Sequence, residues 1–109
     1  MNEKNITNTP DEEESLIVKF GKPYKFEGKE YKEVDLSGLE NLSAADMIAA
    51  DKYLTKSGSF SITPEMTMEY SCFIAAQCSN QPIEFFTGLP SREAIKVKNK
   101  VTGFFYGED

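Results

Sequence analysis

The chain has 109 residues, with 18 acidic and 12 basic side chains, no histidine and a formal net charge of -6. About one domain is expected at this length, so a catalytic domain and a separate binding domain do not both fit. The absence of histidine excludes a Ser-His or Cys-His nucleophile pair, a histidine metal ligand and a histidine pH switch.

The negative charge is concentrated at the N-terminus. Five acids and one base lie in the first 15 residues, so four of the six net negative charges belong to this segment. Apart from Met1, its only apolar aliphatic residue is Ile6, which is too little to offset the conformational entropy of ordering the segment. We therefore expect residues 1–15 to be a disordered, solubilising acidic tail and residues 16–109 to form a single α+β domain.

The remaining residues are nearly neutral, which narrows the range of partners. A phosphate backbone is bound by clustered Lys and Arg, so we do not expect a nucleic-acid partner. No apolar run approaches a membrane span, and the N-terminus has no secretory h-region, so we expect no membrane partner and a cytoplasmic location. Cys72 and Cys78, six residues apart on one predicted helix, diverge too far for a disulfide or a shared metal.

Extended structure is expected first along the chain. Residues 16–20 form an apolar run that predicts a strand stopping at Gly21. Residues 22–36 alternate between aromatic and charged side chains on both sides of Glu27-Gly28-Lys29, which predicts a β-hairpin with Gly28 in its turn.

Helical periodicity begins after residue 37. Ser43 is the expected N-cap of a first helix, with Asp46 at the capping-box position, a stripe of Met47, Ala50, Tyr53 and Leu54, and Gly58 at its end. Thr63 is the expected N-cap of a second, central helix with Pro64 at its first position. Its predicted buried face consists of Met66, Tyr70, Phe73, Ile74, Gln77 and Cys78.

Two more helices complete the predicted fold. The Asn80-Gln81-Pro82 break precedes a short helix over residues 82–87, which ends at Gly88. A last helix, capped by Ser91, carries an apolar stripe of Ala94, Val97, Val101, Phe104 and Phe105. The fold class is therefore α+β and mainly helical, with an N-terminal strand and a β-hairpin packed on a bundle of three to four helices.

No catalytic constellation is present in the sequence. It contains no EF-hand spacing, phosphate-binding glycine loop, nucleophile elbow or dinucleotide fingerprint, and acids spread along helices usually form a solvated face. We therefore expect a protein that is not an enzyme, without catalytic residues, metal or cofactor.

Two features are candidates for binding a partner protein. The pairs Phe85/Phe86 and Phe104/Phe105 could each place one ring in the core and one outward, or both rings could be buried. Arg92, Lys96 and Lys100 recur every four residues and, with Lys98, could meet an acidic partner or form a solvated helix face. We take the outward phenylalanines and these basic residues as candidate partner-binding residues.

The order of these elements resembles the phage tail assembly chaperone family of long-tailed phages and prophages. After the extended opening and hairpin comes the capped helix LSAADMIAADKYL, and a second helix leads into IAAQCSNQPIEFFTGLPSREAIKVKNKVTGFF. In that family a helix closing with an Ala-Ala pair, here Ala75 and Ala76, is followed by a polar turn with Pro, a Leu-Pro segment and an N-capped helix. The likeness covers residues 16–106.

The resemblance implies a non-enzymatic protein that acts in the cytoplasm of the bacterial host. It would bind the tape measure protein, keep it soluble, help recruit tail tube subunits, self-associate, and be absent from the mature virion. Many members of the family also exist in a longer, frameshifted form. Two alternatives stay open: a small acidic inhibitor or adaptor acting on a host or phage protein, and a structural tail or capsid protein.

Overall fold

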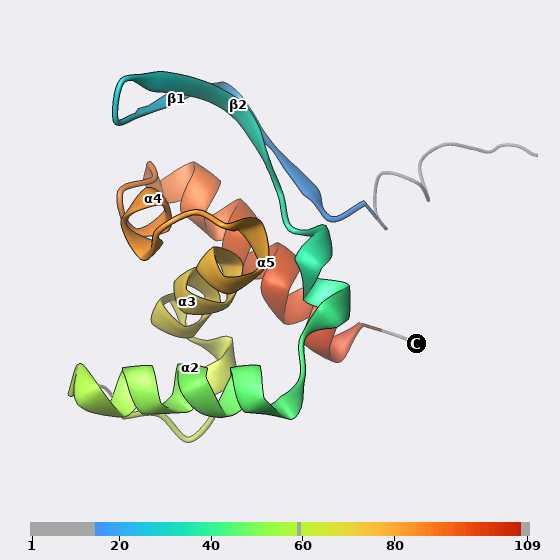
Figure 1. Ribbon diagram of the computed structural model, residues 1–109, viewed down its shortest axis with the longest axis vertical. Helices are drawn as coiled ribbons and strands as arrows, with labels where there is room; N and C mark the ends of the chain where they lie inside the picture. Colours follow the sequence, from blue (N-terminus) through green and yellow to red (C-terminus); the bar gives the residue numbers. More distant parts are fainter. Residues whose placement is uncertain (1–14, 59, 108–109) are drawn as a thin grey trace, which may run out of the picture.

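A computed structural model describes residues 15–58 and 60–107. A two-stranded antiparallel hairpin is followed by helical segments (Figure 1), which confirms the α+β, mainly helical class. The predicted acidic tail lies outside the described residues, apart from Ser15. The elements, where η denotes a 3-10 turn, are β1 Ile17–Phe26, β2 Lys29–Asp35, η1 Ser37–Asn41, α2 Ala44–Lys56, η2 Pro64–Met66, α3 Met68–Ser79, α4 Ile83–Thr87 and α5 Ser91–Tyr106.

The hairpin is one continuous ribbon that lies over α4 and one end of α5 (Figure 1). Its turn is formed as predicted, because Glu27 and Gly28 both take positive φ values, 51° and 82°. The prediction that the first strand stops at Gly21 is wrong, since β1 continues to Phe26. The register with β2 shifts between Lys19 and Tyr24, so this stretch of β1 is irregular rather than terminated.

Helix α2 begins where the sequence predicts. The Asp46 carboxylate accepts a hydrogen bond from the backbone N–H of Ser43 at 2.9 Å, the reciprocal half of a capping box. At the other end, Gly58 has φ +85°, a left-handed conformation that L side chains rarely adopt. Ala50 and Leu54 from the predicted stripe are buried.

The start of the central helix differs from the prediction. Thr63 and Pro64 begin only the short turn η2, and α3 starts four residues later. Its N-cap is Thr67, whose hydroxyl accepts a hydrogen bond from the Tyr70 N–H at 3.1 Å. The two threonines lie four residues apart, and the sequence pattern predicted the helix start at the earlier one.

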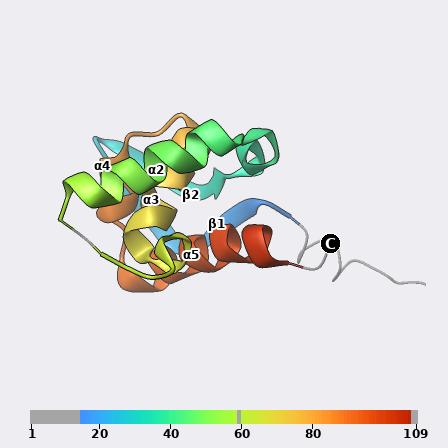
Figure 2. The same cartoon turned by 90° about the horizontal axis from the view of Figure 1, so that it is seen from below.

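Helix α3 is the centre of the helical part and lies between α2 and α5 (Figures 1 and 2). Its buried face differs from the predicted one. Tyr70 and Ile74 are buried as predicted, but Gln77 is exposed, and Met66 is 43% exposed and precedes the helix. Ser71, Cys72 and Ala75, which were not part of the predicted face, are buried as well. Asn80 ends it with φ 61°, and α4 and α5 follow close to the predicted bounds. The N-cap of α5 is Pro90 rather than Ser91, a difference of one residue.

Candidate protein-binding surface

The Phe85/Phe86 pair lies in the core. The two side chains are 0% and 1% exposed, so the expectation that one ring faces outward is wrong for this pair. The reason is the hairpin, which covers α4 with a set of aromatic rings. Four hairpin rings have centroids between 5.0 and 6.4 Å from that of Phe85, namely Phe20, Tyr24, Phe26 and Tyr31.

A hydrogen bond fixes this aromatic cluster. The Tyr24 hydroxyl donates to the Phe85 carbonyl oxygen at 2.8 Å, and burial raises the pKa of Tyr24 above its ordinary value. Phe86, on the other side of α4, contributes to the wall of a concavity of about 490 Å³ together with Met68, Cys72 and Ala94. The cluster therefore joins the hairpin to the helices and does not offer an open aromatic surface.

The second aromatic pair, at the end of α5, divides as predicted. Phe104 is 40% exposed, whereas Phe105 is half-buried with its ring centroid 6.2 Å from that of Tyr70. Within the described part of the chain, no aromatic ring of the hairpin packs against this pair. Phe104 therefore stays available to a partner.

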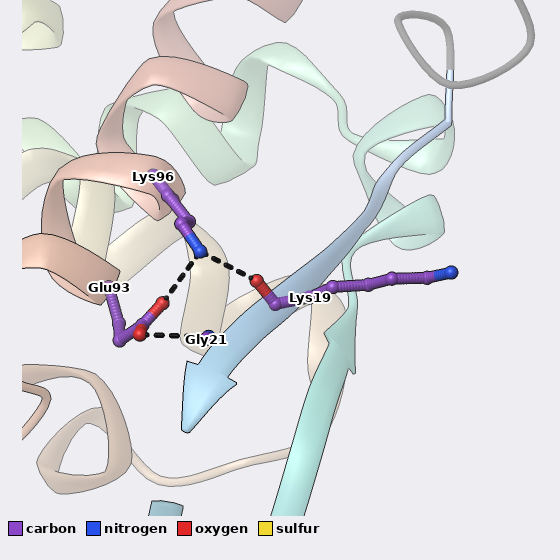
Figure 3. Close-up of polar contacts among 4 residues, drawn as sticks. All are labelled: Lys19, Gly21, Glu93 and Lys96. Atoms are coloured by element: carbon purple, nitrogen blue, oxygen red, sulfur yellow. Dashed lines mark hydrogen bonds and ion pairs between the residues drawn. The ribbon is translucent and has the colours of Figure 1, made fainter. Parts of the chain in front are cut away.

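The basic residues of α5 do not form one uniform surface. Figure 3 shows that the Lys96 ammonium donates to the Lys19 carbonyl oxygen at 3.0 Å and pairs with Glu93 at 3.1 Å. The buried Glu93 accepts the Gly21 N–H at 3.0 Å, in the irregular stretch of β1. Lys96 thus holds α5 against the hairpin, while partner binding by Arg92 and Lys100 stays a prediction.

A shallow groove lies on the outer side of the second half of α5. Its volume is about 680 Å³, and we call it the C-terminal groove. It is lined by Thr63 and Met66 from the segment before α3 and by Asn99, Thr102, Gly103 and Tyr106 from α5. These lining residues are uncharged, and Met66 and Tyr106 are 43% and 57% exposed.

The loop that leads into the C-terminal groove is also apolar. Phe60 and Ile62 are 91% and 90% exposed, the largest exposures among the exposed large hydrophobic side chains of the described residues. The helical periodicity did not single out this segment, because it lies between two predicted helices. Two large apolar residues between Gly58 and Pro64, where turns are usually polar, were the available signal.

The groove has one acidic neighbour at its edge. The Tyr106 hydroxyl donates a hydrogen bond to the Glu65 carboxylate. This bond lowers the pKa of Glu65 and raises that of Tyr106. Burial, followed by the negative charges of Asp51 and Glu65, raises the pKa of Tyr70 to about 12. Carboxylates from two elements, Asp51 of α2 and Glu65 of η2, therefore raise the pKa values of tyrosine side chains.

Metal-ligating side chains do not cluster in the described part of the chain. No group of three or more Cys, Asp or Glu side chains within residues 15–58 and 60–107 could hold a metal ion. Cys72 and Cys78 are free thiols. Over the same residues, no helix is long and apolar enough to cross a membrane.

Comparison with known protein families identifies the family of the chain. The family of phage tail assembly chaperone proteins, described as E, or 41 or 14, matches residues 18–106. The chain belongs to this family. The match covers all the helices and strands described above except Ile17, the first residue of β1. No curated protein and no solved structure gives a significant match.

Membership defines a coarse function for the chain. A tail assembly chaperone acts on other proteins during phage tail assembly in the host cell, so its partners are proteins and its family suggests a non-enzymatic role. The C-terminal groove, with its uncharged lining, is an open concavity on the described part of this chain.

Proposed function

We propose that this chaperone binds the tape measure protein of its phage in the cytoplasm of the bacterial host. It keeps that protein soluble, helps recruit tail tube subunits, and is not retained in the mature virion. The observation that carries the proposal is the C-terminal groove, an open concavity of about 680 Å³ in a member of the tail assembly chaperone family.

The physical basis is the need to cover apolar helix faces before assembly. A tape measure protein presents long amphipathic helices, and their apolar seams aggregate when unpaired. A groove lined by Met66 and Tyr106, next to the exposed Phe60 and Ile62, can receive such a seam by helix-in-groove packing. Arg92 and Lys100 do not line this groove, and their part in partner binding is a separate proposal.

Co-expression with the tape measure protein tests the proposal. The chaperone should raise the soluble fraction of that protein and co-purify with it. A Met66→Ser, Tyr106→Ser double variant should lose most of this effect, because it removes both large exposed side chains of the groove. Ile48→Ser is the matched control, since Ile48 is 53% exposed on α2 and does not line the groove. Equal solubilisation by both variants would contradict the assignment of the groove.

The remaining partners are tested separately. We propose self-association and contact with the tail tube protein, which light scattering and pull-down with purified tube subunits measure directly. Mass spectrometry of purified phage particles should find the tape measure protein but not this chain. Its recovery at the copy number of a tail component would favour a structural protein over a chaperone.

A further inference from the structure

Gly103, in the floor of the C-terminal groove, is a glycine that the fold does not require. It lies inside α5 without a positive φ, and a Cβ built on it meets nothing within 4 Å. Glycine in a helix interior is about 1 kcal/mol less favourable than alanine. Neither a turn nor internal packing therefore accounts for the missing side chain.

Gly38 shows the opposite case in the same molecule. A Cβ there would lie 2.4 Å from the Cys78 carbonyl oxygen, so η1 can pack against α3 only because the residue is glycine. At Gly103 the missing side chain instead leaves space on the solvent side of α5. Without a side chain, the floor between Asn99 and Tyr106 stays open, which allows a second backbone to approach α5 closely.

The charge at the edge of the groove restricts what can fill it. The lining residues are uncharged, and one of them, Tyr106, donates a hydrogen bond to the Glu65 carboxylate. A helix that buries its apolar face here would gain from a basic flank and lose from an acidic one.

We propose that the C-terminal groove binds one amphipathic helix of the tape measure protein, which packs along α5 over Gly103 and places a Lys or Arg next to Glu65. The inference rests on the proposed function. From Asn99 to Tyr106 the groove follows α5 for about 10 Å, a length that about two turns of a partner helix span. Apolar side chains at spacings of three and four would lie between Met66 and Tyr106.

Two designed helical peptides test the chemistry without the tape measure protein. They share one leucine face and carry either lysine or glutamate on both flanks. NMR titration of the full chain should show tighter binding of the lysine peptide, with shifts centred on Thr63, Thr102 and Gly103. Equal binding of the two peptides, or shifts confined to the hairpin, would overturn the proposal.

A large side chain at position 103 tests whether the partner helix approaches α5 closely. Gly103→Leu should weaken binding of the lysine peptide at least about tenfold, which corresponds to about 1.4 kcal/mol. Its melting temperature should be no lower than that of the wild type, because leucine favours helix over glycine. Gln77→Leu adds the same side chain at an exposed position of α3 and should bind normally. Unchanged binding by Gly103→Leu would rule out a close approach over Gly103.

Reversing the edge charge is the electrostatic test. Glu65→Lys should weaken the lysine peptide about tenfold and strengthen the glutamate peptide. Glu33→Lys makes the same change in net charge on the exposed side of the hairpin and controls for the overall acidity of the chain. Equal losses from both variants would show that only net charge matters, which contradicts a base placed beside Glu65.

Repeating co-expression with Gly103→Leu separates the inference from the proposed function. If the wild-type chain fails to solubilise the tape measure protein, the proposed function is wrong. If Gly103→Leu solubilises it as well as the wild type, the function stands and the groove is not its site. If Gly103→Leu instead changes the oligomeric state in light scattering, a second copy fills the groove, and the proposal is also wrong.

Discussion

The two phenylalanine pairs are both Phe-Phe dipeptides, but their surroundings in the structure differ. Phe85 and Phe86 are buried beneath the hairpin, whereas Phe104 is 40% exposed beside its half-buried neighbour Phe105. Both pairs lie near the C-terminal end of a helix. The difference is made by the hairpin, which lies over α4 and contributes four aromatic rings around Phe85 (Figure 1). The Phe85/Phe86 pair thus stabilises the fold, whereas in the second pair Phe105 packs on the core and Phe104 is exposed.

The largest expected effect comes from truncating the buried pair. Phe85→Ala should lower the free energy of unfolding by about 3–5 kcal/mol, because it empties the centre of a closely packed aromatic cluster. Urea denaturation followed by circular dichroism measures this value. Phe104→Ala is the matched control and should cost less than about 1 kcal/mol. Similar losses for the two variants would mean that the pairs do not differ in packing.

A second prediction tests how closely η1 packs against α3. Gly38→Ala should destabilise the chain by about 1–3 kcal/mol, because its Cβ would overlap the backbone of Cys78 in α3. Gly103→Ala should instead stabilise it by about 0.5–1 kcal/mol. Thermal melts of both variants show the sign directly, and a stabilising Gly38→Ala would contradict the close approach of η1 to α3.

The hairpin is also held by a polar contact, which gives a third prediction. Glu93→Ala removes the acceptor of the Gly21 N–H and the ion partner of Lys96, and should cost about 1–3 kcal/mol. Amide exchange in β1 should accelerate more than exchange in α2. Arg92→Ala changes an exposed neighbour and should leave both measurements unchanged. Uniform acceleration across all elements would show that Glu93 acts on global stability and not on the hairpin.

The smallest predicted effect concerns the edge of the groove. The Tyr106 hydrogen bond lowers the pKa of Glu65, so the bond is present above the ordinary carboxyl range and is lost as pH falls through the lowered pKa. Tyr106→Phe should raise the Glu65 pKa toward its ordinary value, as measured by NMR of the carboxyl carbon.

Asp35 is the control for that titration. Its pKa is lowered chiefly by the Ser37 N–H and should not respond to Tyr106→Phe. If the Glu65 pKa did not move in the variant, the Tyr106 contact would be absent in solution.

Local sequence signals predicted most of the elements because capping and turn residues act over a few positions. The Ser43/Asp46 pair, the Glu27-Gly28 turn and the break at Asn80 all lie where the sequence placed them. The boundary of α3 was wrong because the sequence offers both Thr63 and Thr67 as N-caps, and only the Thr67 hydroxyl accepts a capping hydrogen bond in the structure. The end of the first strand was wrong because the bond that satisfies Gly21 comes from Glu93, 72 residues away.

The candidate site was less predictable, since it depends on which elements cover which. Helical spacing divided each aromatic pair into an inward and an outward ring, but only tertiary packing decides whether a second layer covers the outward one. The role of Lys96 could not be predicted for the same reason, because its ammonium bonds to the backbone of β1, which is distant in the sequence. The C-terminal groove joins Thr63 and Met66 to α5, a contact that no local pattern reveals.

Hydrogen–deuterium exchange of the chaperone, free and bound to its tape measure protein, tests the central claim most directly. The account predicts slower exchange on binding in residues 60–66 and 99–106, with little change in the hairpin, residues 17–35. Protection confined to the hairpin, with residues 99–106 unchanged, would contradict it and would place the partner on the opposite region of the molecule.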